Sequence, residues 1–257
     1  MGLGLTLLVV VVALLASALA PFDPFALAGP PLAPPSRAHL MGTDALGRDL
    51  FSGVLHGART SLLVATVVGA LVMTIGLAVG MASGYRGGLL DDVLMRVTEI
   101  FQTLPRFFLA IVVAALFGSE LRYLVLVLGL TSWALVARVV RSEVLSLRGS
   151  EFVEAARASG ASDIRIILRE ILPNTLPAAI AYLGLLLAQV ILLEASLGFL
   201  GLIDPSVISW GYLAGQAQRF LRVAWWLSLF PGVAIMVAVL GLNLLADALT
   251  DVLGGRG

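Results

Sequence analysis

The sequence predicts an all-α integral membrane protein with six membrane-spanning helices. Hydrophobic residues make up 60% of the 257 residues, charged residues only 12%, and the mean hydropathy is +1.03. A soluble domain carries about 25% charged residues. The short alternating segments typical of a transmembrane β-barrel are not visible. The apolar runs place the spans at about 3–20, 62–83, 98–118, 121–140, 175–193 and 226–246.

The residue types that are missing exclude several kinds of chemistry. The chain has no cysteine and no lysine, which excludes thiol nucleophiles, thiolate metal sites and the lysine of a nucleotide-binding P-loop. Its two histidines, His39 and His56, lie in one segment between spans, where two polar loop residues are a better interpretation than a metal site. We therefore expect no catalytic residue, metal site, bound cofactor or nucleic-acid partner in this chain.

The first apolar run, residues 3–20, is long enough to span a bilayer. A cleaved signal peptide is the alternative, because residues 18–20 (Ala-Leu-Ala) resemble a cleavage site. The basic start of such a peptide is missing, so a retained helix is favoured. The sequence leaves the true translation start open.

A proline-rich segment, residues 21–37, follows the first span and is expected to be irregular. Thr43 or Asp44 is then predicted to cap a short amphipathic helix, separate from the next span. We assign residues 1–61 to an N-terminal helix with an extracytoplasmic segment. Residues 62–257 form the predicted transmembrane domain.

Glycines recur every four residues in the second span, at Gly76, Gly80 and Gly84. Small residues at this spacing let helix backbones approach closely in lipid. We expect this glycine face to pack tightly against a neighbouring helix of the bundle.

The third span has an apolar core of only 13 residues, 105–117, so it must begin upstream. This places Glu99 and Gln102 at the membrane boundary as candidate pathway or gate residues. Pairing of Glu99 with Arg96 or Arg106 is an equally good interpretation.

Arginine placement predicts which side of the membrane each loop faces. Ten of the 16 basic residues, all arginine, lie in segments 84–106 and 138–172 and in the C-terminal tail. Basic residues concentrate in cytoplasmic loops. We therefore expect a multi-pass protein of the cell (inner) membrane with these segments and both termini in the cytosol.

The cytosolic segment 150–172 is unusually polar for this chain and predicts two helices. Residues 150–159 favour a helix, which Gly160 is expected to end in a left-handed conformation. Ser162 and Asp163 can cap a second helix. Pro173, which lacks an amide hydrogen, is expected to stop it. The result would be a helix-turn-helix lying across the membrane face, with an apolar stripe formed by Ile164, Ile167, Leu168 and Ile171.

The outer surface of this segment has features typical of a docking site. Ala155 and Ala156 are small enough for a partner to approach the backbone closely. Arg165 and Arg169 are like charges at i,i+4 spacing, whose repulsion an anion would relieve. A cytosolic protein and anionic lipid headgroups are both compatible with this pattern.

Three elements of the segment resemble the EAA loop of ABC importer permeases. They are Glu154-Ala155-Ala156, Gly160 six residues after Glu154, and Pro173 thirteen residues after Gly160. In that family the loop contains a coupling helix that docks into the ATP-binding subunit. The resemblance implies ATPase-coupling roles for Glu154, Ala155, Ala156, Arg157, Gly160 and Pro173.

About residues 37–250 resemble one group of these importers, the dipeptide/oligopeptide/nickel permeases. The resemblance rests on GTDALGRDLFSGVLHGARTSL, DDVLMRVTEIFQTLP and LLEASLGFLGLI, and it indicates the subunit type with an N-terminal GTD-x-x-GRD segment. Glu170 departs from the pattern, since many other importers carry an apolar residue three positions before the proline.

This resemblance implies a type I ABC importer fold and a set of partners. They are a homologous permease subunit, two cytosolic ATP-binding subunits, an extracytoplasmic solute-binding protein and the surrounding membrane lipid. ATP and Mg²⁺ would bind to the ATPase subunits, while this chain would form half of the translocation path. The implied cargo is a peptide, with nickel complexes or glutathione as alternatives.

An ion-coupled secondary transporter is the alternative mechanism. Such proteins need ionisable groups near the middle of the membrane, often beside broken helices. Glu99, Glu194 and Asp247 are all expected near helix ends, which argues against ion coupling without excluding it.

Overall fold

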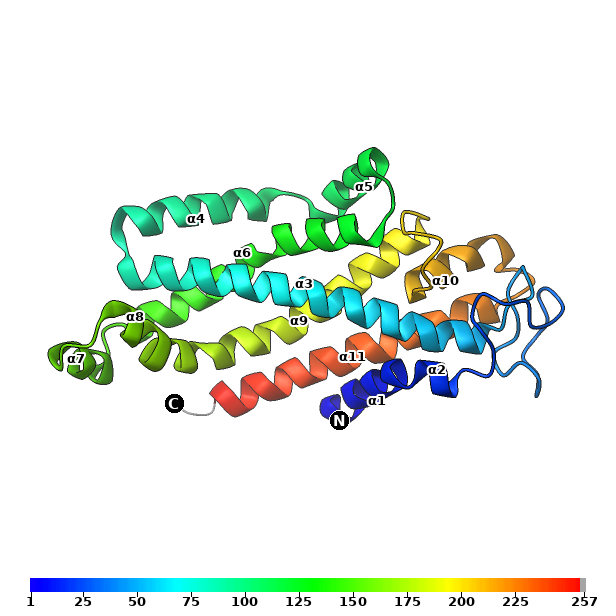
Figure 1. Cartoon of the computed structure of the whole chain (residues 1–257), viewed down its shortest axis with the longest axis horizontal. Helices are drawn as coiled ribbons and strands as arrows, with labels where there is room; N and C mark the ends of the chain where they lie inside the picture. Colours follow the sequence, from blue (N-terminus) through cyan, green and yellow to red (C-terminus); the bar gives the residue numbers. More distant parts are fainter. Residues whose placement is uncertain (255–257) are drawn as a thin grey trace.

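The computed structural model describes residues 1–254, and this part of the chain is an elongated bundle of helices without a named strand (Figure 1). Arg256, one of the arginines expected in the cytosol, lies outside the described residues. The elements in order are α1 (Gly2–Leu14), α2 (Ala16–Leu19), α3 (Leu50–Arg86), α4 (Gly88–Thr103), α5 (Arg106–Phe117), α6 (Leu121–Leu147), α7 (Glu151–Ala158), α8 (Asp163–Ile166), the π-helical turn η1 (Ile167–Ile171), α9 (Leu172–Phe199), α10 (Trp210–Ala217), the 3-10 turn η2 (Gln218–Phe220) and α11 (Trp226–Gly254).

The all-α membrane fold is confirmed. Four helical stretches are long and apolar enough to cross a membrane, and the bent pair α4–α5 makes a fifth if it counts as one span. The expected first span corresponds to α1 and α2, which separate at Leu15, and α1 packs along α11. The four stretches are Leu50–Arg86, Leu121–Leu147, Asp163–Phe199 and Trp226–Val252.

The prediction of a separate amphipathic helix after residue 43 is wrong, because α3 runs without a break from Leu50 to Arg86. Its cap is Asp49, whose carboxylate accepts a hydrogen bond from the Ser52 amide at 2.8 Å. Thr43 instead orders the preceding loop, since its hydroxyl donates to the Pro30 carbonyl. The division of the chain at residues 61 and 62 stays a prediction, and that position lies within α3.

The glycine face of α3 packs against α6, as the spacing of four predicts. A Cβ atom on Gly76 would come within 2.6 Å of the Val136 side chain, and one on Gly80 within 2.6 Å of the Ala137 carbonyl. Backbone contact this close excludes any larger side chain. The pair α3–α6 therefore forms the centre of the bundle.

The third predicted span is not one straight helix, because α4 and α5 meet at 74° around residues 104 and 105. Pro105 supplies no amide hydrogen to continue the ladder of α4. Gln102 on the last turn of α4 lies beside Ala134, near the midpoint of α6, with its amide nitrogen 3.5 Å from the Ala134 carbonyl. The break therefore lies about halfway along the bundle (Figure 1).

The expectation that Pro173 stops a helix is also wrong. The stretch Asp163–Phe199 is one helical rod of 37 residues, and it passes Pro173 through the π-helical turn η1. A proline is tolerated in the first turn of a new α-helical stretch, where its amide would have no intrahelical partner. Only α7 is thus a separate helix, and α8 is the end of the α9 rod.

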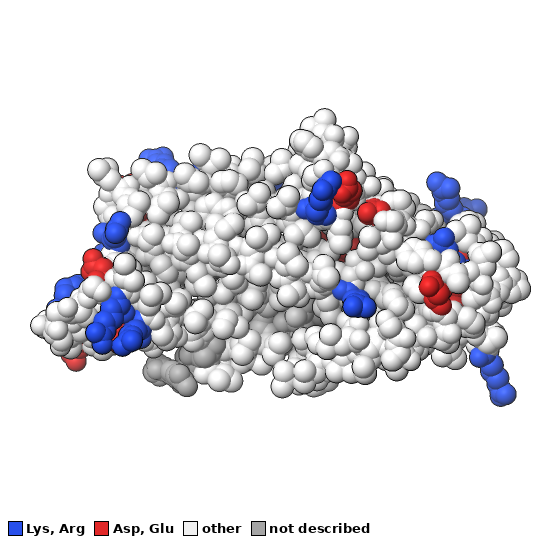
Figure 2. Space-filling view, in the orientation of Figure 1, with Lys and Arg blue, Asp and Glu red and all other residues white. Residues whose placement is uncertain are grey.

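Charged side chains gather towards the two ends of the elongated molecule (Figure 2). A broad band between these ends is almost free of charge on the visible face, as expected for the part that contacts lipid. At one end lie α7 and α8, and at the other lie the loop 21–49 and α10 (Figure 1).

Candidate functional site

The first candidate site is the inner end of the bundle, formed by α7, α8 and η1. Helix α7 has Glu151 and Glu154 in its first turn, where the helix dipole favours acidic residues. Gly160 ends α7 with φ +77°, as predicted. The amide of Ala161 donates to the Ala156 carbonyl and that of Gly160 to the Arg157 carbonyl. These two bonds form a Schellman cap, which reverses the chain towards α8.

The inner end is part of the main core and not a flap. Val153, Ile166 and Ile171 are fully buried in the main hydrophobic cluster. Ile166 and Ile171 are five residues apart, the spacing of the π-helical hydrogen bond, and both side chains are buried against the core. The predicted apolar stripe is therefore only partly right, because Ile164 and Leu168 are 71% and 55% exposed.

Polar side chains tie this end to the α3–α4 corner. The Tyr85 hydroxyl, at the end of α3, donates to the Asp163 carboxylate at 2.8 Å. Arg157 on α7 also interacts with Tyr85, and this hydrogen bond raises the pKa of the Arg157 guanidinium. The coupling segment is thus connected to α3 through side chains that lie at the surface.

A bidentate ion pair connects the beginning of α4 with the end of α6. Arg141 donates from Nε and Nη2 to the two carboxylate oxygens of Asp91, each at 2.6 Å. Ser83 also donates to Asp91, and Arg148 donates to the Gly84 carbonyl at 3.2 Å. Such charge-assisted pairs are the stronger hydrogen bonds of proteins.

Two of the six predicted coupling residues, Ala156 and Gly160, line a groove of about 230 Å³ between α7 and α8. Ala156 is half-buried and lines this groove with Gly160, Arg165 and Glu170. The remaining predicted residues, Glu154, Ala155, Arg157 and Pro173, are exposed, and Pro173 stands apart from the others at the start of α9.

The two predicted gate residues do not act as a pair. Gln102 is half-buried, and its side-chain oxygen accepts a hydrogen bond from Arg138 at 2.7 Å. Glu99 is exposed on α4. Within residues 1–254 it forms no ion pair with Arg96 or Arg106.

The outer end contains a fully buried carboxyl group that the sequence placed merely at the end of a span. Glu194 lies inside α9 with no exposed surface, and the Ser61 hydroxyl of α3 donates to its Oε2 at 3.0 Å. No described atom pairs with Oε1. The signal available in the sequence was a single acidic residue with apolar neighbours on both sides.

Helix α10 is held against this region by close contacts. The indole of Trp210 donates to the Val54 carbonyl at 2.9 Å. A Cβ on Gly198 would lie 2.4 Å from the Gly211 carbonyl carbon, and one on Gly215 would lie 2.4 Å from the Gly198 carbonyl oxygen. The backbones of α9 and α10 therefore touch directly, which the sequence did not predict.

One face of α9, opposite the side that packs on α3, lines three successive openings. We call this the groove face. The inner opening, about 390 Å³, includes Ala178 and Tyr182, and the middle opening, about 480 Å³, includes Gln189 and Ser196. Successive lining positions three or four residues apart place them on one side of a helix. The groove face thus runs the length of the membrane-spanning rod.

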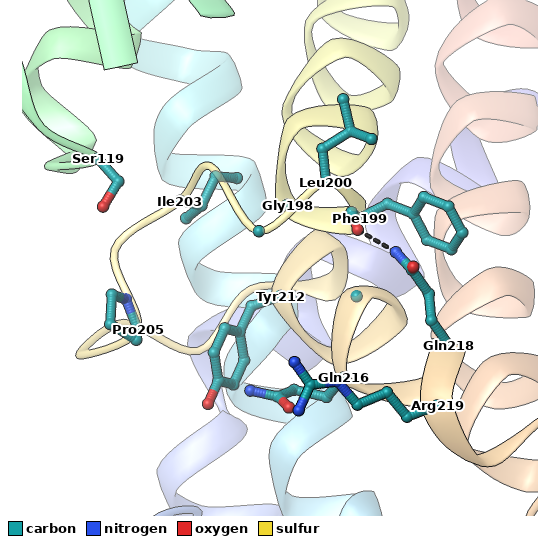
Figure 3. A pocket seen from close by; sticks show the side chains of 12 residues that line it. Ser119, Gly198, Phe199, Leu200, Ile203, Pro205, Tyr212, Gln216, Gln218 and Arg219 are labelled. Carbon is teal, nitrogen blue, oxygen red and sulfur yellow. Dashed lines mark hydrogen bonds between the residues drawn. The ribbon is translucent and has the colours of Figure 1, made fainter. Parts of the chain in front are cut away.

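The outer opening, about 540 Å³, lies where α9 ends and α10 begins (Figure 3). Tyr212 and Gln216 of α10 lie close to Arg219 of η2, and Gln218 donates to the Phe199 carbonyl (Figure 3). Polar groups therefore line one side of this opening, and Leu200 and Ile203 line another, at the end of the molecule opposite α7.

Arg106 lines the middle opening and is the least expected charge in the structure. Its position in the sequence suggested the cytosolic side, but it follows the break between α4 and α5, halfway along α6. An arginine at the centre of a membrane helix costs about 2.5–3.5 kcal/mol on insertion scales. Charges at such positions usually mark a functional path.

Comparisons with known proteins agree with this architecture. Residues 74–256 match the family model of the binding-protein-dependent transport system inner membrane component. A permease of Brucella suis biovar 1, named for a peptide transport system, is 41% identical over 264 residues, covering 99% of this chain and 87% of that protein. A glutathione transport system permease protein of Pectobacterium atrosepticum is 36% identical, covering 85% of this chain and 73% of that protein.

The fold also resembles that of a solved transporter. A chain of the inward-facing MetNI methionine ABC transporter superposes with a TM-score of 0.64 at 19% identity, covering 79% of this chain and 97% of that chain.

Proposed function

Because the chain belongs to the family of binding-protein-dependent transport system inner membrane components, we propose that it forms half of a translocation path for peptides. It is the permease component of an ABC importer and not an enzyme. ATP and Mg²⁺ bind to separate cytosolic subunits, which drive this chain through the segment 150–172. Family membership and the absence of a lysine for a P-loop support this division of labour.

The observation that carries the proposal is the apolar surface at the inner end. Phe152, Ile164 and Leu168 are 40%, 71% and 55% exposed at a charged end of the bundle. Exposed apolar side chains rimmed by polar residues mark protein interaction sites. We assign this surface, with Glu154, Ala155 and the groove beside Gly160, to contact with an ATPase subunit.

The way in which this surface is connected to the membrane-spanning helices supports a coupling mechanism in which one helix acts as a lever. Asp163–Phe199 is one helical rod, and the fully buried Ile166 and Ile171 fix its inner end in the core. A displacement at α8 therefore moves the rod that carries the groove face. In the complex, closure of the two ATPase subunits pushes on this rod, so that the translocation path becomes accessible alternately from the two sides of the membrane.

The remaining partners follow from the surfaces that are left. Gln189 and Ser196 are exposed on a membrane helix, where contact with lipid alone is unfavourable. A homologous permease subunit facing the groove face would enclose these residues in a shared path. The loop 21–49 and α10 face outward towards an extracytoplasmic solute-binding protein, and both termini lie in the cytosol.

Peptides are the proposed cargo because the Brucella relative is named for peptide transport. Glutathione is the best-supported alternative, since another relative is named for it, and nickel complexes remain the third candidate. Ion-coupled secondary transport is not supported, because the family is binding-protein-dependent.

The proposal is tested with the assembled transporter in vesicles. Replacing Glu154 with Arg is expected to leave the chain inserted while uncoupling solute uptake from ATP hydrolysis, because it reverses charge on the docking surface. Glu120→Arg, at the exposed turn before α6, is the matched control and should leave coupling unchanged. Uptake by the wild-type protein that follows a proton gradient without ATP would contradict the importer mechanism.

A second arm uses the absence of native cysteine. A cysteine at Ala155 should form a crosslink with an ATPase subunit, whereas one at Arg37 in the outer loop should not. Labelling of the residue 155 cysteine from outside intact cells would overturn the proposed orientation.

A further inference from the structure

We propose that the middle opening of the groove face is a transit site for the carboxylate of the transported solute, held by Arg106 and Gln189. The inference rests on the proposed function, because it requires the groove face to line the path. It goes further by naming the chemical group that is recognised within the membrane. The opening measures about 480 Å³ and is lined by Leu104, Arg106, Gln189, Leu192, Leu193 and Ser196.

The guanidinium of Arg106 lacks a counter-ion within the part of the chain that the structure describes. Two arginines of α6 are already bonded to other side chains, since Arg141 pairs with Asp91 and Arg138 donates to Gln102. None of the hydrogen bonds or ion pairs within residues 1–254 involves the Arg106 side chain. A guanidinium at membrane depth needs an anion or water, and the opening gives access to both.

The other polar groups of the opening favour an anion. Gln189 is exposed and offers two amide hydrogens, and no acidic residue lines the opening. The Ser196 hydroxyl donates to the Leu192 carbonyl at 2.7 Å, so it contributes only acceptor capacity. A guanidinium fork matches the two oxygens of a carboxylate, which identifies that group as the best ligand.

The apolar side chains agree with a solute that carries both a carboxylate and a hydrocarbon part. Leu104 and Leu192 are 36% and 45% exposed beside Arg106 and Gln189. A short peptide with a free C-terminus has this chemistry. The open shape of the site suits transient contact, since a path must release what it binds.

The charge of the opening is tested with thiol reagents in the assembled transporter, because the chain has no cysteine of its own. Ser196→Cys places a thiol in the opening, and its reaction rates with anionic sulfonatoethyl and cationic trimethylammonioethyl methanethiosulfonate are compared. With Arg106 present, the anionic reagent should react faster than the cationic one. Arg106→Gln should lower the ratio of the anionic to the cationic rate about tenfold, which is the lower end of the rate increase expected in a charged cleft. Arg106→Lys should keep most of the preference. Glu120→Cys, at the exposed turn before α6, is the control, whose ratio should not respond to Arg106→Gln.

Two outcomes would overturn the site. A residue 196 cysteine that reacts with neither reagent would mean that lipid or protein covers the opening. An unchanged ratio in Arg106→Gln would mean that a carboxylate of the partner permease already neutralises Arg106.

Uptake measurements distinguish a failure of this site from a failure of the proposed function. ATP-driven uptake of radiolabelled trialanine should fall about tenfold in Arg106→Gln, matching the loss of one charge-assisted contact. Uptake of trialanine amide should change much less. Equal uptake of trialanine by both proteins would refute recognition of the carboxylate. If the wild-type protein transports neither probe, the peptide cargo of the proposed function fails, while the thiol ratio still decides whether the opening attracts anions.

Discussion

The inner and outer ends of the bundle are held together in different ways. At the inner end α3 and α6 also pack closely, but surface side chains tie α4 and α8 to them, with Tyr85 bonded to Asp163 and Asp91 paired with Arg141. At the outer end, backbones touch at Gly198 and Gly211, and a buried carboxyl group joins α9 to α3. Side-chain contacts near water are weak and exchangeable, whereas close backbone packing permits one arrangement. We therefore expect the outer end to act as the fixed support and the inner end to be the part that moves.

The largest expected effect is loss of the support in Gly198→Ala. The added methyl would lie 2.4 Å from the Gly211 carbonyl carbon, and both sides of this contact are backbone. Because neither helix can yield without moving α10, we expect destabilisation of about 3 kcal/mol or more. The measurement is the thermal midpoint of the purified chain in detergent.

Gly232→Ala is the matched control, since a Cβ at Gly232 would meet no atom within 4 Å. Both changes gain the same helix propensity, so the difference between them isolates the contact. Equal midpoints for the two variants would contradict the assignment of the outer end as the rigid support.

A smaller effect is expected when the buried carboxyl group is removed. Glu194→Ala leaves the Ser61 hydroxyl without its acceptor and opens a cavity in the core. Together these losses should cost about 2–3 kcal/mol. Glu194→Gln keeps the volume and the acceptor oxygen, so it should cost less than about 1 kcal/mol. Denaturation midpoints are measured for both variants, for Ser61→Ala and for the double variants. The resulting double-mutant cycle gives the coupling energy between the two side chains. A zero coupling energy would show that the two groups do not meet.

The inner end should respond to charge and salt instead. Asp91→Asn removes the charge and one of the two acceptor oxygens of a bidentate pair whose side chains are 13% and 32% exposed, and it should cost about 1 kcal/mol of stability. The larger consequence is a lower ratio of solute transported to ATP hydrolysed, because the α4–α6 corner beside the coupling segment is loosened. Raising the salt concentration should reduce the stability difference between variant and wild type.

The exposed pair of Arg122 and Glu120 is the control for this comparison. Its side chains are 65% and 53% exposed, so Glu120→Gln should change neither stability nor coupling measurably. If Asp91→Asn behaves like Glu120→Gln, the inner end is not held by its charges.

The same contrast explains what could be predicted from the sequence. The glycine face of α3 and the cap at Gly160 are local signals, since spacing and residue type suffice to identify them. The continuation of the helix past Pro173 was missed because a π-helical turn accommodates the proline, and no residue type predicts such a turn. The break of the third span at Pro105 was missed as well, because the apolar run around this proline predicted one continuous span.

The buried contacts of the outer end and the middle opening could not be predicted for a different reason. Ser61 and Glu194 are 133 residues apart, and the partner of a buried polar group depends on which helices meet. Arg106 was counted with the cytosolic arginines because sequence position alone does not give depth. The coupling roles of Glu154, Ala155, Ala156, Arg157, Gly160 and Pro173 stay predictions, as does the role of Glu99 and Gln102.

The smallest expected effect concerns the loop that joins the two rigid helices of the outer end. In the turn after α9, the Ser206 hydroxyl and amide both donate to the Asp204 carboxylate, at 2.6 and 2.9 Å. These bonds lower the pKa of Asp204 in the folded chain. A lowered pKa adds stability above the ordinary value of about 3.9, and this contribution is lost as the pH falls through the folded pKa.

Ser206→Ala removes the hydroxyl bond and should move the protonation of Asp204 to higher pH. The carboxyl band of the infrared spectrum, taken as the difference from Asp204→Asn between about pH 6 and pH 2, reports this shift. The groups are near the surface, so the thermal midpoint at neutral pH should barely change. A clear fall in that midpoint would mean that the turn is part of the rigid support, and the boundary between fixed and mobile parts would move outward to include it.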